Sequence, residues 1–437
     1  MTSGTNPGGG GGTTPVIASD ALISSFNLDE LIHVDAVTGQ PGNRWLVGNG
    51  PVDVASWGND AYVANALSQD VTVIDRLANN VAGTIDVTSQ PITGVSFLSF
   101  LDSILKPMVR PTGIAVTPLG TKAFSANLLN VTVINTTTNQ PTKSIIGMAP
   151  INLGNILANP SGALNSFMAS PVPGLGMAKV ACNNDVAVVT CLITGKLMRI
   201  DARQEQVIDY IDVGRAPIGV TIARNKAYVA CAMSQETVVV DLVTGQIRAR
   251  IRGGMLPIDA ATNMAEDRVY VANAFSGDIS VIDTAADVII DTLPAGLSVT
   301  SLLAQMGITL PATGGNSVMN LLNAFLQGYT TGLSNPASFG NLLLGSSSSL
   351  LSPGALVNGL LTGFLAFAGV SQQALNGINL PAFGIWSVAV AHDPNLICSA
   401  NAIMGDMAIT QAQSRSVNSL MGLTGLGPAD VSTVWRR

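Results

Sequence analysis

Three aspartates recur at equivalent places in the sequence, and their side chains are well suited to bind a cation. Asp53, Asp259 and Asp430 each stand third in a phrase that begins with proline, and Ser387 stands third in the related phrase Ile385-Trp-Ser. Oxygen-only donors of this kind suit a hard cation such as Ca²⁺. The alternative is a structural role, in which each carboxylate accepts hydrogen bonds from backbone amides and waters where a strand begins.

The sequence lacks the usual catalytic and cofactor motifs. His33 falls in a strand-like run and His392 in a turn, and neither is expected to act as a base for a Ser or Cys nucleophile. There is no GxGxxG, no GxxxxGK[ST] and no HExxH. The four cysteines lack zinc or redox spacing and are expected to be buried thiols, at Cys182, Cys191, Cys231 and Cys398. We therefore predict no catalytic residue and no cofactor-binding residue.

The aspartates belong to a repeat of about forty residues. Three apolar phrases at 217–221, 226–231 and 237–241 return at 257–261, 268–273 and 279–283. Clear copies also begin near residues 51 and 111, and weaker copies near 176 and 384. Each phrase is short, β-branched and bounded by Gly, Asn, Asp or Pro, and a fourth apolar run such as 81–87 closes the unit. The repeat predicts four-stranded antiparallel sheets.

Sheets of this size bury both faces by stacking radially, which predicts an all-β propeller. Six blades are expected to start near residues 51, 111, 176, 216, 256 and 384. The chain ends supply a seventh, because 427–432 matches the first-strand phrase at 50–55 while residues 15–48 hold only second, third and fourth strands, at 15–19, 31–35 and 44–48. We predict a seven-bladed β-propeller over 15–437, closed by strand exchange between the N- and C-termini.

The ring order gathers the candidate ligands. First strands line the axial channel of a propeller, so their third residues should face its mouth. We assign these residues, in blade order, as Asp53, Gly113, Gly176, Gly219, Asp259, Ser387 and Asp430. Asp259, Ser387, Asp430 and Asp53 are then consecutive in the ring and predict a metal site, with Ca²⁺ as the expected ion. Because carboxylates this close repel, at least one should bind an ion or have a raised pKa.

A second set of aspartates ends the third strands, and we assign it to turns rather than to chemistry. Such a carboxylate accepts bonds from the backbone amides just ahead of it and so favours the chain reversal into the fourth strand. The residues are Asp35, Asp75, Asp201, Asp241 and Asp283.

The repeats resemble a known family. Tyr62-Val-Ala-Asn65 and Tyr270-Val-Ala-Asn273, each followed by Val-Ile-Asp, are similar to the YVTN β-propeller repeat, and the resemblance covers most of the chain outside its insertions. It implies a seven-bladed ring, often in exported or cell-surface proteins that bind or scaffold, and an extracellular or cell-surface location rests on it alone. The motif specifies a blade and no chemistry. Cys191 and Cys231 depart from the pattern by replacing its Asn.

Three insertions, at 88–110, 148–175 and 297–382, interrupt the repeat between a fourth strand and the next first strand. They should therefore rise from the same face of the ring. No Asp, Glu, Lys or Arg occurs between Lys143 and Lys179, nor from 292 to 392. Runs at 318–326 and 355–368 have helix-like apolar spacing. We predict short apolar helices that form a cap on one face.

Residues 351–370 are free of charge and long enough to be a candidate membrane span. The Pro, Asn and Gly residues of this segment and the lack of flanking positive residues disfavour a span. Two roles for the cap remain, and they are compatible. The cap can pack on the ring itself, or it can dock onto a partner subunit or an apolar surface. Residues 1–14 read as a flexible Gly-rich tail without a recognisable secretion signal.

Composition limits the partners. Hydrophobic residues make up 47% of the 437 residues and charged residues 11%, and the net charge of −7 comes without a basic run. Nucleic acid is therefore not an expected partner. We predict a non-enzymatic structural or interaction protein that docks partner subunits or self-assembles through its cap, in a surface layer, a virion or a multi-subunit complex. The alternative is a metal-dependent propeller hydrolase or lactonase acting in the axial channel with Asp53, Asp259 and Asp430.

Overall fold

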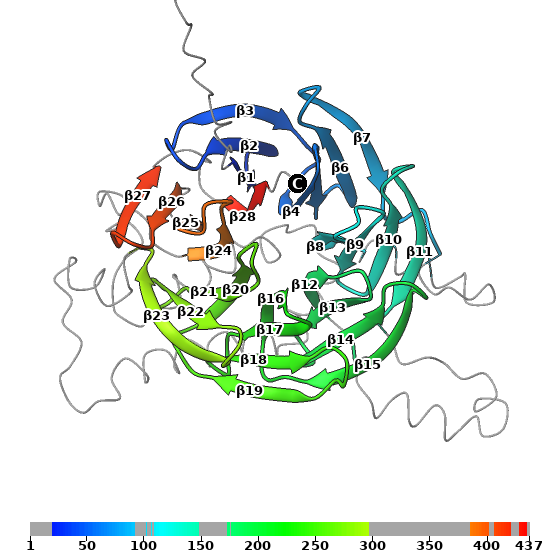
Figure 1. Ribbon diagram of the computed structural model, residues 1–437. Helices are drawn as coiled ribbons and strands as arrows, with labels where there is room; N and C mark the ends of the chain where they lie inside the picture. The colour runs from blue at the N-terminus through cyan, green and yellow to red at the C-terminus, as the bar shows by residue number, and fades with distance from the viewer. Residues whose placement is uncertain are drawn as a thin grey trace, which may run out of the picture.

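Seven four-stranded antiparallel sheets form a ring in the computed structural model, which describes residues 20–91, 102, 106, 109–147, 173–174, 176–296, 385–401, 406–420 and 428–434. Each sheet is one blade, and the blades stand side by side around a central axis (Figure 1). The innermost strand of every blade contacts the innermost strands of both neighbours, so the ring is closed. The predicted seven-bladed β-propeller is confirmed.

Each blade runs from an inner first strand to an outer fourth strand. The first strands are β4 (Pro51–Trp57), β8 (Pro111–Val116), β12 (Met177–Cys182), β16 (Pro217–Ala223), β20 (Pro257–Thr262), β24 (Ile385–Val390) and β28 (Pro428–Val434). The second strands are β5 (Asp60–Asn65), β9 (Lys122–Asn127), β13 (Val186–Cys191), β17 (Lys226–Cys231), β21 (Arg268–Asn273), β25 (Leu396–Asn401) and β1 (Asp20–Ser25). The third strands are β6 (Asp70–Asp75), β10 (Asn130–Asn135), β14 (Lys196–Asp201), β18 (Glu236–Asp241), β22 (Asp278–Asp283), β26 (Asp406–Gln411) and β2 (Glu30–Asp35). The fourth strands are β7 (Asn80–Asp86), β11 (Gln140–Ile146), β15 (Gln206–Asp212), β19 (Ile247–Ile251), β23 (Val288–Pro294), β27 (Ser416–Leu420) and β3 (Pro41–Leu46).

The two ends of the chain share one blade, as predicted. β28 pairs antiparallel with β1, with Val431 opposite Ile23 and Asp430 opposite Ser24, and the sheet order is β28-β1-β2-β3. Figure 1 shows the red β28 beside the blue β1 at the inner edge of the ring. The exchange gives every blade the same four strands, so the first and last parts of the chain hold each other in place.

The second strand of this shared blade was placed wrongly from the sequence. It was expected at residues 15–19, which lie outside the described residues, whereas β1 spans Asp20–Ser25 and pairs with β2 from Asp20 opposite Asp35 to Ser25 opposite Glu30. The physical reason is the short loop between second and third strands. Four residues, 66–69, separate β5 from β6, and 26–29 make the same connection between β1 and β2.

Burial falls from the inside of each blade to the outside. The second strands are almost wholly buried, since neighbouring blades cover both faces of the sheet there. Tyr62 and Val73 of one blade, for example, pack in one cluster with Ile114 and Ile134 of the next. The fourth strands instead expose alternate residues, as a strand does when one face meets solvent. The YVAN phrase is thus the sequence of a strand covered on both sides.

The aspartates that end the third strands form the predicted turns. Asp241 illustrates the pattern, because its Oδ1 accepts bonds from the amides of Val243 and Thr244 at 3.0 and 2.9 Å. These amides, chiefly that of Thr244, hold the pKa of Asp241 below its usual value, and the equivalent amide bonds do the same for Asp35 and Asp283. The same pair of amide bonds is present at Asp75 and Asp201.

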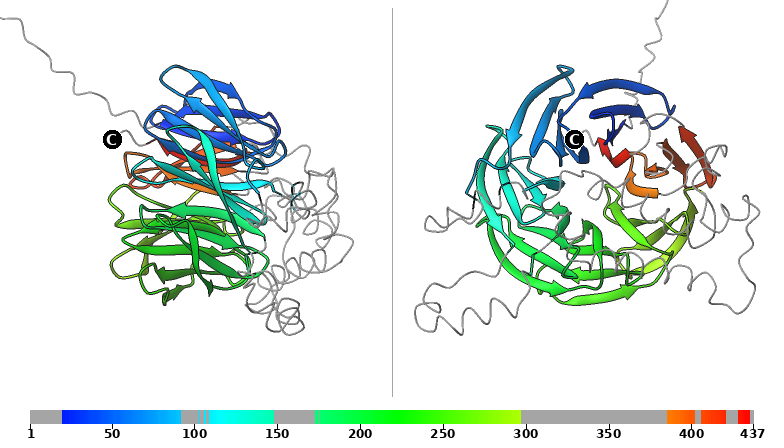
Figure 2. Two further views of the ribbon diagram at one scale, coloured as in Figure 1. Left: turned by 90° about the vertical axis from the view of Figure 1, so that its right-hand side faces the viewer. Right: turned by 180° about the vertical axis from the view of Figure 1, so that it is seen from behind.

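Every connection from a fourth strand to the next first strand lies on one face of the ring, because four antiparallel strands return the chain to the face where it began. The side view in Figure 2 shows the ring edge-on with its strands crossing between the two faces. The insertions 88–110, 148–175 and 297–382 are three of these connections. The predicted helices and the cap lie outside the described residues, as do 1–14 and 351–370. No helix in the described part of the chain could cross a bilayer.

Deleting residues 427–437 removes β28 and should open the ring. The deletion exposes β1 and removes the buried side chains of Asp430, Val431 and Thr433. We expect the midpoint of thermal unfolding to fall by about 10 °C or more, measured by circular dichroism, whereas deletion of residues 1–14 should leave it unchanged. Equal melting of the truncated and full chains would contradict closure by β28.

Candidate functional site

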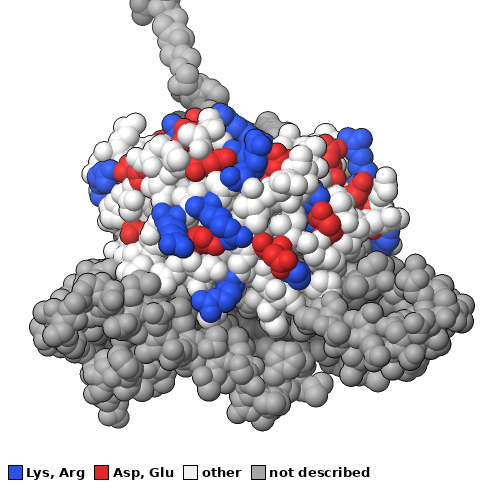
Figure 3. Space-filling view, turned by 90° about the horizontal axis from the view of Figure 1, so that it is seen from below, with Lys and Arg blue, Asp and Glu red and all other residues white. Residues whose placement is uncertain are grey.

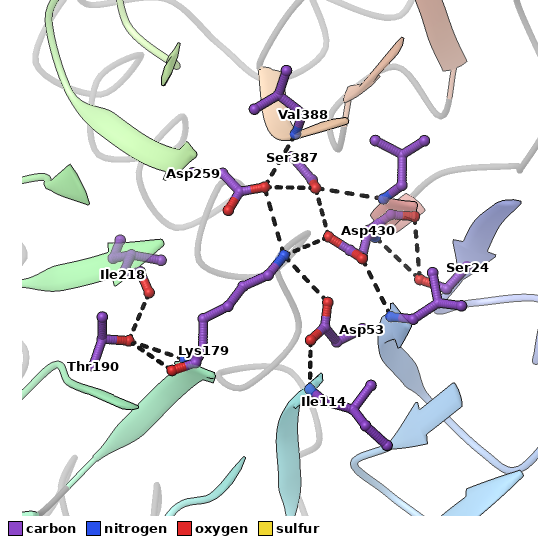
Figure 4. A network of polar contacts seen from close by, with 12 residues as sticks. Ser24, Asp53, Ile114, Lys179, Thr190, Ile218, Asp259, Ser387, Val388 and Asp430 are labelled. Carbon is purple, nitrogen blue, oxygen red and sulfur yellow. Dashed lines mark hydrogen bonds and ion pairs between the residues drawn. The ribbon is translucent and has the colours of Figure 1, made fainter. Parts of the chain in front are cut away.

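The first strands bring the four predicted ligands together on the axis of the ring (Figure 4). The Ser387 hydroxyl donates a hydrogen bond to Asp430 Oδ1 at 2.5 Å and lies 2.8 Å from Asp259 Oδ2. The side chains of Asp53, Asp259 and Asp430 are 2 to 4% exposed. Charges removed this far from water are costly unless they are paired or hydrogen-bonded.

Each aspartate also joins its blade to the next blade in the ring. One carboxylate oxygen accepts the backbone N–H that follows the third position of the neighbouring first strand. These bonds run from Ile114 to Asp53 at 2.6 Å, from Val388 to Asp259 at 3.1 Å and from Val54 to Asp430 at 3.2 Å. The structural role considered from the sequence, acceptance of hydrogen bonds from strand amides, is therefore present at all three aspartates.

A lysine ammonium lies among the three carboxylates. Lys179 Nζ is 2.6 Å from Asp430 Oδ1, 3.2 Å from Asp53 Oδ1 and 3.5 Å from Asp259 Oδ2. Its side chain comes from β12, on the far side of the axis from β28, and extends across the centre in Figure 4. We call Lys179, Asp53, Asp259, Asp430 and Ser387 the axial cluster. It joins five of the seven blades, across the ring as well as along it.

Lys179 corrects the predicted set of channel residues. The sequence assignment gave Gly176 as the third residue of this blade, but β12 begins at Met177, so Lys179 stands third. Gly176 has a φ of 74° and Gly50 a φ of 62°, and each immediately precedes its first strand. Both need this left-handed conformation, which glycine adopts freely. Alignment of Gly176 with Gly50 instead of Gly113 would have revealed the lysine.

The lysine changes the interpretation of the site. The structure places the ammonium of Lys179 between oxygens that were predicted to hold Ca²⁺. Within the described ranges, no group of three or more His, Cys, Asp or Glu side chains has the geometry of a metal centre. Binding of Ca²⁺ stays a prediction, and the adjacent positive charge opposes it.

Burial and mutual repulsion shift the protonation of the cluster. Removal from water raises the pKa of Asp53 well above its usual value, and repulsion by Asp430 raises it further, while Lys179 opposes the shift. Burial likewise raises the pKa of Asp259 against the effect of Lys179. Burial lowers the Lys179 pKa, but the three carboxylates outweigh it and bring the pKa well above the usual value. The expected raised carboxyl pKa is thus present at two positions.

Two glycines leave room for the cluster. A β-carbon on Gly219 would lie 2.4 Å from the Asp259 Cα and 2.7 Å from its Oδ1. A β-carbon on Gly113 would lie 2.9 Å from the Lys179 Cα. Both glycines were predicted to stand third in their first strands, and both do. Their lack of a side chain permits the close approach of β8 to β12 and of β16 to β20.

The remaining candidate groups are a histidine that lies away from the axial cluster and four cysteines whose thiols are unreactive at neutral pH. His33 Nε2 pairs with Asp20 Oδ1 at 3.0 Å on the second and third strands of the shared blade. The cysteines are free, and three of the four are buried. Burial raises the pKa of each thiol to about 12, so the reactive thiolate is scarce at neutral pH.

Comparison with known proteins identifies the fold but no family. No family model matches the sequence, and no curated protein matches it. A functionally unknown protein from Desulfotomaculum acetoxidans is similar in structure, with a TM-score of 0.59, 10% sequence identity, and coverage of 96% of this chain and 100% of that one. The hydrazine synthase of Kuenenia stuttgartiensis gives a TM-score of 0.47 at 16% identity, with 92% of each chain covered.

Replacing Lys179 with methionine should strongly destabilise the ring. The substitution keeps a long apolar stem but leaves three buried carboxylates without their cation, which costs about 3 to 5 kcal/mol. Urea unfolding at pH 7.5 would measure the loss, and part of the stability should return at pH 5 as the carboxyls take up protons.

The matched control for Lys179→Met is Lys196→Met. Lys196 Nζ pairs with Asp212 Oδ1 at the same 2.6 Å, but Asp212 is 83% exposed. A solvated pair contributes about 1 kcal/mol or less, so this change should have little effect. Equal losses in the two variants would show that the axial cluster does not hold the ring together.

The raised pKa of Asp53 predicts a pH dependence of stability. The folded protein keeps a proton on this carboxyl at pH values where the unfolded chain, with a pKa of 3.8, has lost it. Stability should therefore decline as pH rises above 3.8 toward the folded pKa. The Asp53→Asn variant has no proton to lose and should show a shallower decline in urea unfolding between pH 4.5 and 8. Identical slopes would contradict the raised pKa.

Proposed function

We propose that this protein is a non-enzymatic interaction and assembly module, in which the propeller presents three insertions, two of them free of charged residues, to a partner subunit or to a second copy of the chain. The observation that carries the proposal is the common face from which the insertions leave. Strands β7, β11 and β23 end on the face where β8, β12 and β24 begin, so residues 88–110, 148–175 and 297–382 are all attached to that face.

The distribution of charge supports this proposal. Lys and Arg side chains alternate with Asp and Glu along the side of the ring shown in Figure 3. The sequence from 144 to 178 and from 292 to 392 has no such residue. An apolar surface of more than a few hundred Å² on a soluble protein is typical of an interaction site. A ring with a charged edge and two long insertions without charged residues is suited to docking through one face.

The state of two of the three axial carboxylates also favours binding over catalysis. Asp53 and Asp430 engage both oxygens, one with Lys179 and the other with a backbone amide. A general base or metal ligand needs a free lone pair directed at substrate or metal. Groups already committed to holding blades together are better suited to stability than to hydrolysis.

Replacing residues 298–381 with a short Gly-Ser linker tests the proposal. The ring contains its own core and should keep the far-ultraviolet circular dichroism of the full protein, because the junctions follow β23 and precede β24. We expect the full chain to form a larger particle by native mass spectrometry or light scattering, and the variant to be a monomer. An unchanged native mass, or a full chain of 44.8 kDa without a co-purifying protein, would contradict the proposed assembly.

A further inference from the structure

The first strands enclose a cavity of about 530 Å³ on the axis of the ring. The axial cluster forms one end of it, through Asp53, Lys179, Asp259 and Asp430. The other end lies at the hairpins between first and second strands, where Trp57 and Glu266 reach the surface. This volume falls in the range of about 300 to 1,000 Å³ that small-molecule sites occupy in proteins.

The wall of the cavity is made of small and apolar side chains. The fifth residue of the first strand is alanine in five blades, and in the other two it is Thr221 or Ser432. Valine and isoleucine precede or follow most of these positions. Such a wall can cover a short hydrocarbon chain, and its uniformly small side chains leave the axis open.

The charged groups that line the cavity favour a positively charged ligand. Asp53, Asp259, Asp430 and Glu266 are acidic, whereas Lys179 is basic. One ammonium thus stands among four acidic groups, and a second positive charge in the cavity would lower the pKa of the carboxyls that burial has raised. Because the carboxylates of the cluster are 2 to 4% exposed, water screens this attraction poorly.

One carboxylate oxygen in this wall lacks a hydrogen-bond partner. Asp259 Oδ2 accepts a bond from the Val388 amide and lies 2.8 Å from the Ser387 hydroxyl oxygen, but Oδ1 is buried and has no partner among the described residues. Oδ1 lies beside Gly219, whose lack of a side chain leaves room for it. A buried acceptor without a donor costs about 1 to 3 kcal/mol, and more when charged. A hydrogen-bond donor on a bound ligand would satisfy Asp259 Oδ1.

We propose that the axial cavity binds a small organic ammonium ion with a short apolar chain. The ammonium donates to Asp259 Oδ1 at the end formed by the axial cluster, and the chain lies along the small residues of the wall. A divalent metal fits this site less well, because Ca²⁺ needs six to eight oxygen ligands at about 2.3 to 2.6 Å and Lys179 occupies the centre of the carboxylates. An ammonium ion needs only acceptors and tolerates the apolar wall.

Titration with n-butylammonium chloride in a calorimeter tests the proposal on the full-length protein. We expect saturable binding to one site and a rise in the melting temperature with ligand concentration. Neutral n-butanol and tetramethylammonium chloride, which lacks N–H donors, should not bind at the same concentrations. Saturable binding of either control with equal affinity, or stabilisation by CaCl₂ but not by n-butylammonium, would overturn the proposal.

Two variants locate the binding site. Asp259→Asn removes the charge and should weaken binding about tenfold or more. Ala261→Leu fills the cavity two residues along the same strand, on the side that Asp259 faces, and should abolish binding while the melting curve still shows a folded ring. Asp212→Asn, at an exposed carboxylate on the outer strand β15, is the matched control and should bind like the wild type. Undiminished binding by Ala261→Leu would overturn the proposal even if Asp259→Asn fails to fold.

Discussion

The stability of the ring depends on the pairing of the buried charges where the seven first strands meet at its axis. Lys179 crosses the axis and pairs with Asp53, Asp259 and Asp430, whose other hydrogen bonds reach the amides of neighbouring blades. A buried ion pair gains little over an apolar contact in free energy, but breaking one by removing a partner is costly. The axial cluster therefore holds particular blades opposite each other, and loss of one partner costs stability because buried charges are left unpaired.

The rest of the molecule follows from the repeat around this centre. Second strands such as Tyr62-Val-Ala-Asn65 are covered on both faces, which explains their uninterrupted apolar sequence. Third strands end in an aspartate that stabilises the turn to the fourth, and the pKa of that carboxyl is low where the turn amides hold it. The same residue type thus has a lowered pKa at the rim and a raised pKa at the axis, because only the axial residues are deprived of water.

Most of the fold was predictable from the sequence, because each blade repeats the same local pattern. The ring closure could be predicted because residues 427–432 match a first strand but are not followed by second, third and fourth strands in the sequence. The errors arose where the pattern is weak. Residues 15–19 were taken for the strand that begins at Asp20, and Gly176 was aligned three residues out of place, which hid Lys179. A pattern of residue types cannot show which side chain crosses an axis, since that contact joins residues 251 apart in the chain.

The shared blade also fixes the order in which the protein can be completed during synthesis. Ser24 Oγ and the backbone of Asp430 form hydrogen bonds across 406 residues of chain. From the synthesis of β1 until the synthesis of β28, β1 has an unpaired inner edge. Such an edge can pair with a neighbouring nascent chain. A polysome that carries several copies therefore presents a risk of intermolecular closure, in which β28 of one molecule completes the ring of another.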